Sequence, residues 1–144
     1  MNKLIIFLSF ALCVSACNIR NTKNKNSSQD LTTNGQFTDT TTVQIIDSVY
    51  NFGTVTDGEK VSYNYRFRNT GNKPLIIASA VASCGCTVPE KPEQPIKPGE
   101  TGFLKVVFNS DGRGGDVHKE ITVTSNAYPK FPPLQLVGHV DPAK

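Results

Sequence analysis

The chain has 144 residues, of which 38% are hydrophobic, and it carries a formal net charge of +3 at pH 7. Between residues 43 and 144, 11 basic side chains nearly balance 10 acidic ones and are dispersed along the sequence, which excludes the electrostatic footprint of a nucleic-acid-binding protein. This stretch of 102 residues is enough for one domain and too short for two.

The N-terminus has the parts of a secretory leader. Lys3 gives a positive start, residues 4–14 are apolar, and small residues follow. The apolar run is shorter than the roughly 20 residues that a membrane-spanning helix needs. The sequence Val-Ser-Ala-Cys at residues 14–17 resembles a bacterial lipoprotein signal, in which the leader is cut before the Cys and the thiol is lipidated. We therefore predict a removed signal at residues 1–16 and lipid on Cys17. The alternative is ordinary secretion with cleavage after Ala16, which leaves a free thiol.

Residues 17–42 are predicted to be the lipidated Cys and a flexible linker. After Cys17 the segment consists mainly of Asn, Thr, Ser, Lys and Gln, a composition that buries too little apolar surface to offset chain entropy. As a coil of about 25 residues, the linker would span roughly 25–30 Å. Asn18 follows Cys17, and no acidic run comes after it. By resemblance to lipoproteins of Gram-negative bacteria, these features favour a location at the periplasmic face of the outer membrane. The protein would bind the lipid membrane through Cys17.

The pattern from residue 43 onward is that of β-strands. Val43–Tyr50 is a less regular candidate strand, and Val61–Arg68 alternates apolar and polar residues strictly, as a strand with one buried face does. Leu75–Val81 is apolar or small on both faces. Further strands are indicated around residues 104–108, 121–123 and 134–140, with turn signals at residues 56–59, 69–74, 97–100 and 110–115. We interpret the last turn, which is rich in Gly, as a long hairpin loop.

About seven short strands without any helical period predict an all-β fold, a single immunoglobulin-like β-sandwich at residues 43–144. An antibody-type domain is excluded, because the chain has no Trp and the two cysteines of this region are two positions apart. Five segments together resemble the bacterial family called domain of unknown function 1573. They are VYNFGTV at 49–55, FRNTGNKPL at 67–75, SCGCT at 83–87, IKPGE at 96–100 and ITVTSN at 121–126. The resemblance implies a fold like that of major sperm protein and pilus chaperones, in lipoproteins or secreted proteins of Bacteroidetes-like bacteria, and it implies no activity.

Cys84 and Cys86 form the one unusual local feature, a Cys-Gly-Cys sequence followed by a Pro-rich loop through residue 98. An extended chain would place the two Cα atoms about 7 Å apart, at the limit for a disulfide, but a turn at Gly85 would shorten this distance. Three interpretations compete. The first is a locally constraining disulfide or two inert thiols, the second a redox-active pair, and the third a Cu(I) site. Zinc would need two more ligands, and strand parity places His118 and His139 on solvent faces as plain surface residues.

No catalytic residue is predicted. A nucleophilic Cys needs a base and an orienting group, and no sequence signature places a histidine beside Cys84. We therefore expect a non-enzymatic, membrane-anchored module without a cofactor that binds an envelope protein partner or takes part in assembly. The alternative is a periplasmic thiol-redox or Cu(I)-handling protein that uses Cys84 and Cys86. The sequence indicates neither the partner nor the oligomeric state.

Overall fold

The computed structural model describes residues 39–144. The predicted signal, Cys17 and most of the predicted linker lie outside this range. Within it, no helix is long and apolar enough to cross a membrane. Eight strands run through the described residues: β1 (Val43–Ile45), β2 (Val49–Thr56), β3 (Lys60–Asn69), β4 (Ile77–Ala82), β5 (Thr87–Glu90), β6 (Thr101–Asn109), β7 (Gly115–Ser125) and β8 (Leu134–Asp141).

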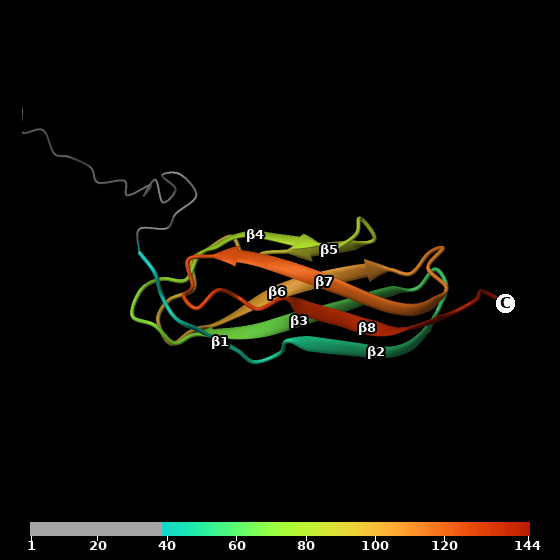
Figure 1. The fold of residues 1–144 in the computed structure, drawn as a ribbon, viewed down its shortest axis with the longest axis horizontal. Coiled ribbons are helices and arrows are strands. Elements are labelled where there is room, and N and C mark those ends of the chain that lie inside the picture. The colour runs from blue at the N-terminus through green and yellow to red at the C-terminus, as the bar shows by residue number, and fades with distance from the viewer. Residues whose placement is uncertain (1–38) are drawn as a thin grey trace, which may run out of the picture. The chain divides into compact units, whose positions relative to one another are not determined.

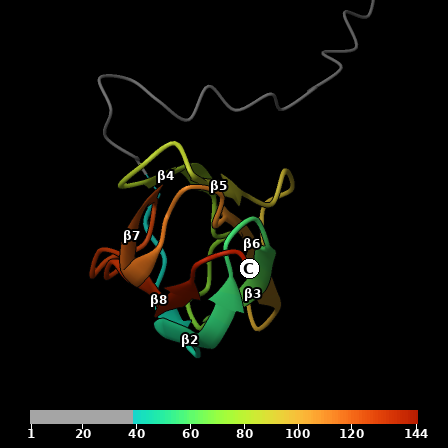
Figure 2. The ribbon, with the colours of Figure 1, turned by 90° about the vertical axis from the view of Figure 1, so that its right-hand side faces the viewer.

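The strands form two four-stranded sheets packed face to face (Figure 1). The first sheet has the order β1-β3-β6-β5, and the second has the order β2-β8-β7-β4. All neighbours are antiparallel except β2 and β8, which are parallel. Seen end-on in Figure 2, β4 and β5 lie together on one side of the sandwich, and β2 and β3 lie on the other. The prediction of an all-β, immunoglobulin-like sandwich is confirmed.

The core lies between the sheets, where alternate residues of each strand point inward. In β3, the pattern seen in the sequence places Val61, Tyr65 and Phe67 in the interior. Tyr65 is fully buried, and its hydroxyl donates to the carbonyl of Gln135 at 2.6 Å, so it links the two sheets. Burial raises the pKa of Tyr65, which keeps the phenol protonated as a donor. The buried apolar residues are Val61, Tyr65, Phe67, Leu75, Ile77, Ile96, Leu104, Val106, Phe108, Val117, Ile121, Val123, Ala127, Phe131, Leu134, Leu136 and Val140.

The structure has eight strands where the sequence indicated about seven. The predicted strand Val43–Tyr50 is divided, and β5 lies in the Pro-rich segment, for which no strand was predicted. β1 belongs to the first sheet and β2 to the second, so the chain changes sheets between them. At the break, the N–H groups of Ile46 and Asp47 both donate to the carbonyl of Arg66, at 3.0 and 3.2 Å. The Asp47 carboxylate also pairs with the Arg66 guanidinium at 2.7 Å. These contacts with β3 fix the corner at which the chain passes from the first sheet to the second. The alternation of apolar and polar residues in the sequence does not indicate this corner.

The Asp47–Arg66 pair predicts a specific acid sensitivity. Its hydrogen bonds hold the pKa of Asp47 below its ordinary value. Between the folded-state and the unfolded-state pKa of Asp47, the unfolded state therefore binds more protons than the folded state. The stabilisation is complete above about pH 4 and is lost as the pH falls through the lower folded-state pKa. We expect Asp47→Asn to lower stability at pH 7 and to flatten the dependence of the urea midpoint on pH below pH 4. An unchanged acid limb in this variant would contradict the assignment.

Two predicted loops differ from the structure. The Pro-rich segment contains β5, in which Pro89 lies opposite Val106. Proline is tolerated there because β5 is an edge strand, whose outward side needs no N–H donor. The Gly-rich segment at residues 110–115 was interpreted as a hairpin loop, and this is wrong, because it joins β6 of the first sheet to β7 of the second.

The fold begins shortly before the boundary predicted at Val43. Thr41 is buried, its N–H donates to the carbonyl of Asn126 at 3.1 Å, and its hydroxyl donates to the Asn69 side chain at 2.9 Å. A Cβ on Gly71 would lie 2.6 Å from the Thr42 nitrogen, so only glycine permits this close approach. The last residues of the predicted linker are therefore part of the folded unit.

Candidate functional site

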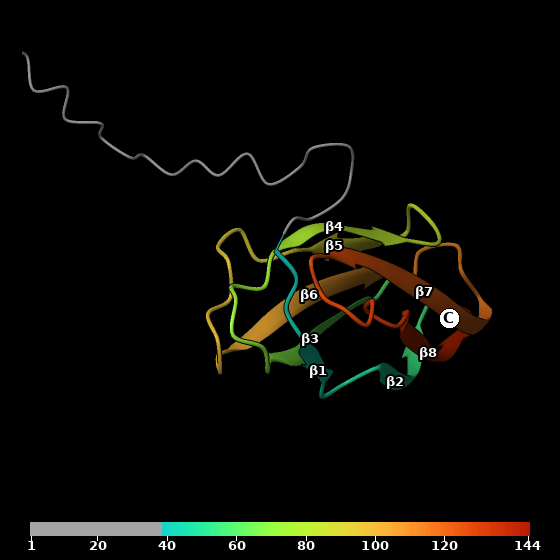
Figure 3. The ribbon, with the colours of Figure 1, turned by 60° about the vertical axis from the view of Figure 1, so that its left-hand side comes forward.

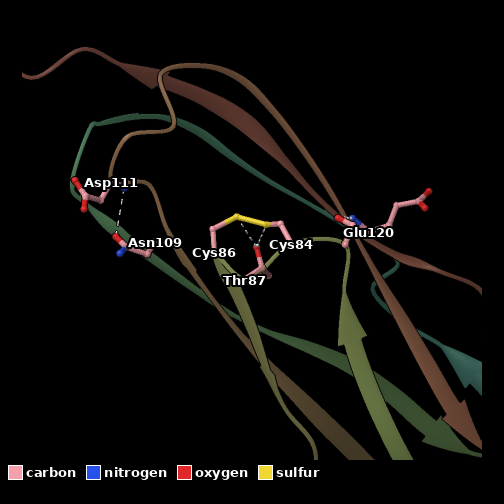
Figure 4. Close-up of a disulfide and its surroundings, with 7 residues drawn as sticks. Cys84, Cys86, Thr87, Asn109, Asp111 and Glu120 are labelled. Atoms are coloured by element: carbon pink, nitrogen blue, oxygen red, sulfur yellow. Dashed lines mark hydrogen bonds between the residues drawn. A yellow bond between two sulfur atoms is a disulfide. The ribbon is translucent and has the colours of Figure 1, made fainter.

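Cys84 and Cys86 are joined by a disulfide in the turn between β4 and β5 (Figure 4). Their Cα atoms are 5.4 Å apart, within the range that a disulfide bridges. The N–H of Thr87 donates to the Cys84 carbonyl at 3.3 Å and closes the turn, and the Thr87 hydroxyl lies 3.7 Å from the Cys84 sulfur. The structure contains a disulfide, which is the oxidised state common to the structural and the redox-active interpretations.

The disulfide turn connects the two sheets at one end of the sandwich. On one side, the N–H of Ser83 donates to the carbonyl of Glu120 in β7, at 2.9 Å. On the other side, the N–H of Asn109 at the end of β6 donates to the Cys86 carbonyl, also at 2.9 Å. The turn therefore fixes the end of β4 against the second sheet and the start of β5 against the first.

An open groove of about 460 Å³ lies beside the disulfide, on the outer face of the first sheet. Val88 and Val107, which are opposite each other in β5 and β6, contribute apolar surface, and Lys60 and Arg113 contribute cations. Gly85, Cys86, Asn109 and Asp111 complete its lining. This set offers contact surface of mixed character.

The two histidines do not join the cysteines. Neither lines the groove, and no group of three potential metal ligands is found among residues 39–144. His118 is exposed on β7. His139 lies on the surface near the C-terminus, with Nδ1 2.7 Å from an Asp116 oxygen and Nε2 3.6 Å from an Asp141 oxygen. Sequence parity found the solvent-facing position of His139 but not its contact with Asp116, because Asp116 lies on the adjacent strand.

Because the disulfide closes so small a ring, it is expected to contribute little to stability. The loop-closure model gives about 1.6 kcal/mol for three residues, against about 3 kcal/mol for a 15-residue loop. We predict that the double variant Cys84→Ser, Cys86→Ser remains folded and loses no more than about 1.6 kcal/mol in urea unfolding. A loss above about 3 kcal/mol, the figure for the 15-residue loop, would show that the bridge supports more than its own turn.

The other candidate site near the disulfide turn is β4, which forms one edge of the second sheet. Each sheet has two edge strands, and all four carry a feature that discourages a further strand, although the register shift of β4 lies before Ser79 and leaves the rest of its edge regular. β1 has only three residues, β2 has an irregular register between Asn51 and Thr54, and β5 contains Pro89. Residues 79–82 of β4 are Ser-Ala-Val-Ala, without charge or proline. Among residues 39–144, no strand pairs with β4 on the side away from β7.

The beginning of β4 is less accessible than its end. Leu75 and Ile96 exchange backbone hydrogen bonds at 2.8 and 2.9 Å, so the segment after β5 runs beside the residues that lead into β4. The register of β4 with β7 also shifts between Ile77 and Ser79. The open part of the edge therefore extends from Ser79 to the disulfide turn. Figure 3 shows β4 at the border of the second sheet, beside β7.

The direction of the free backbone groups follows from the ladder with β7. Ser83 donates its N–H to the Glu120 carbonyl, and Ala82 lies opposite Ile121. In an antiparallel ladder, every second residue points its N–H and C=O to the partner strand and the residues between point theirs away. Val81 therefore pairs with β7, whereas Ala80 and Ala82 present a donor and an acceptor each to the open side.

The side chains along this edge are small or apolar. Val81 is 61% exposed on the outer face, opposite Thr122, whereas Ala80 and Ala82 pack against the core. Hydrophobic pattern reasoning found a strand here but not its position at a sheet edge, because sheet order depends on long-range pairing. The absence of charge from residues 76 to 83 is the sequence signal that could have indicated it.

Comparison with solved structures shows the fold. A protein of unknown function from Porphyromonas gingivalis W83 matches with a TM-score of 0.58 and 19% identity, over 76% of this chain and 49% of that one. The chain thus spans about half the length of that protein. An ASH/PapD-like domain of human CEP192 matches with a TM-score of 0.55 and 14% identity, over 73% of this chain and 89% of that one. The YadV chaperone matches with a TM-score of 0.51 and 15% identity, over 69% and 52%.

Comparison with protein families is more specific. The family model described as "Protein of unknown function (DUF1573)" matches residues 43–140, which is nearly the whole described fold. No curated protein matches the sequence.

Proposed function

Because the chain belongs to the DUF1573 family, whose function is unknown, we propose a function from its own surface. The protein is a lipid-anchored, non-enzymatic immunoglobulin-like module that binds a protein partner in the bacterial envelope. The partner adds an extended strand to the open edge of β4. This mode of recognition uses backbone hydrogen bonds for affinity and side chains at alternate positions for specificity.

The observation that carries the proposal is the unprotected edge at Ser79–Ala82. Native sheets protect their edges with charges, prolines, bulges or very short strands, because an open edge is a template for pairing. The other three edges of this sandwich follow that rule, and β4 does not over these residues. An edge left open in a domain that protects the others is suited to a partner strand.

The anchor supports the same function. Lipid on Cys17 would hold the domain at the membrane, and two acyl chains already give stable anchoring at about 0.8 kcal/mol per buried methylene. The predicted linker after Cys17 would then act as the tether, and a coil of about 25 residues reaches roughly 25–30 Å. A partner of the β4 edge would therefore lie close to the same membrane.

The thiol alternative has no comparable support among residues 39–144. Cys84 and Cys86 share a disulfide, and the groove beside them is lined by no histidine. Their place in the fold suits a structural role, since the turn that they close ends the open part of β4. We therefore assign to the disulfide the shaping of this end of the sandwich.

Site-specific photocrosslinking in the intact envelope tests the proposal. A benzophenone amino acid replaces Val81 of the full-length protein, and in a matched control it replaces Val88, which is 55% exposed on the proline-containing edge β5. We expect a protein adduct from position 81 and little or none from position 88. If position 81 gives no adduct, or if both positions react equally, partner binding at β4 is wrong.

A further inference from the structure

We propose that the strand added to β4 is β4 of a second copy of this chain, so that two anchored molecules form a dimer with one continuous eight-stranded sheet. This inference rests on the proposed function, because it identifies the partner of the same edge. The geometry of the open backbone groups, the side chains beside them and the tether all favour a second copy.

An antiparallel pairing of the edge with itself satisfies the outward groups. When a twofold axis passes beside Val81, Ala80 of one copy faces Ala82 of the other, and Ala82 faces Ala80. Both of these residues point their N–H and C=O away from β7, so each facing pair exchanges two hydrogen bonds. A closed twofold contact of this kind uses the same surface on both copies and stops at a dimer.

The side chains fit the same axis. Val81 lies opposite Val81 of the second copy, at a position without backbone hydrogen bonds between the copies, where facing side chains approach most closely. Its side chain, 61% exposed in the single chain, would gain an apolar neighbour there. On each side of this contact, Ser79 of one copy faces Ser83 of the other. Residues 79–83 carry no charge, so the two copies bring no like charges together.

The size of the contact explains why a tether would be needed. A pairing of about five residues per strand is a small interface, below the roughly 1,200 Å² of total area that stable complexes usually bury. In dilute solution such a dimer would be weak. Anchoring both copies to one membrane through short linkers raises their effective concentration, which strengthens a weak contact without adding new ones.

The test uses two differently tagged full-length copies, expressed together in the native envelope, with the benzophenone amino acid at position 81 of one copy. A covalent adduct that contains both tags is expected. An adduct with a different protein would overturn self-pairing and leave strand addition to β4 in place. The absence of any adduct, or a crosslink only within one chain to its own N-terminal segment, would overturn both proposals.

Variants at the edge provide the second readout. Val81→Lys places two ammonium groups opposite each other, and Ala80→Pro removes an outward N–H without touching the ladder with β7. Crosslinking from position 83 should fall by about tenfold or more in each variant, which corresponds to about 1.4 kcal/mol. Val88→Lys, with similar exposure on the other edge, should leave the yield unchanged. Equal crosslinking yields in all variants would overturn the proposed pairing of the two β4 strands about Val81.

Discussion

Asn69→Asp is expected to have the largest effect on stability of any single exchange considered for this domain. Asn69 is fully buried, and its side-chain amide donates to the carbonyls of Lys73 and Ile96, at 2.7 and 2.9 Å. Its oxygen accepts from the hydroxyl of Thr41 and from the N–H of Gly71, at 2.9 and 3.1 Å. One side chain thus holds the N-terminal segment and two loops together.

A carboxylate keeps the two accepted bonds of Asn69 but donates none, so two carbonyl groups lose their donor and face a negative charge. Each unsatisfied buried group costs about 1–3 kcal/mol, so we expect a total loss of about 3 kcal/mol or more in urea unfolding. Asn72→Asp makes the same chemical change at an exposed position three residues away and should shift the midpoint little. Similar midpoints for the two variants would contradict this role of Asn69.

Cys17→Ala is expected to have the largest effect on location. The proposed lipid is attached to this thiol, so the variant protein should leave the outer-membrane fraction. The first contact of the described fold is made by Asp39, whose carbonyl accepts from the Asn126 side chain at 3.0 Å. This residue is far along the chain from Cys17, so the domain should keep its fold. Fractionation of cells followed by immunoblotting measures the first outcome, and circular dichroism of the released protein measures the second.

Cys13→Ala is the matched control, because Cys13 lies in the predicted leader and should be absent from the mature protein. It should leave both the location and the fold unchanged. If Cys17→Ala protein stays in the outer-membrane fraction, the lipid anchor is wrong. If its β-sheet signal is lost, the separation of tether and domain is wrong.

Local sequence pattern predicted most of the fold because strand formation here follows burial on one face. The strict alternation at Val61–Arg68 became β3, and the less regular Leu75–Val81 gave β4, shifted to Ile77–Ala82. The division of Val43–Tyr50 into β1 and β2 was not predictable in this way. It depends on Arg66, which lies about 20 residues further along the chain and fixes the corner through Asp47.

The candidate site was predictable only in part. Cys84 and Cys86 were found from spacing, and their place at one end of the sandwich followed from the preceding strand. The open edge was not found, since a strand becomes an edge only when all the other strands have taken their places. Pro89 marks one edge of the sandwich by its chemistry, whereas the edge at Val81 is marked only by missing charges.

Hydrogen exchange at the amides of Ala80 and Ala82 tests strand addition to β4 most directly. Exchange is measured by mass spectrometry with residue-level fragmentation, for full-length protein in native membranes and for the same protein diluted in detergent. Because both N–H groups point away from β7, strand addition predicts rapid exchange in the dilute protein and exchange slower by about tenfold or more in the membrane. The amide of Val81, which pairs with β7, should change little. Equally rapid exchange of Ala80 and Ala82 in both states would contradict strand addition to β4.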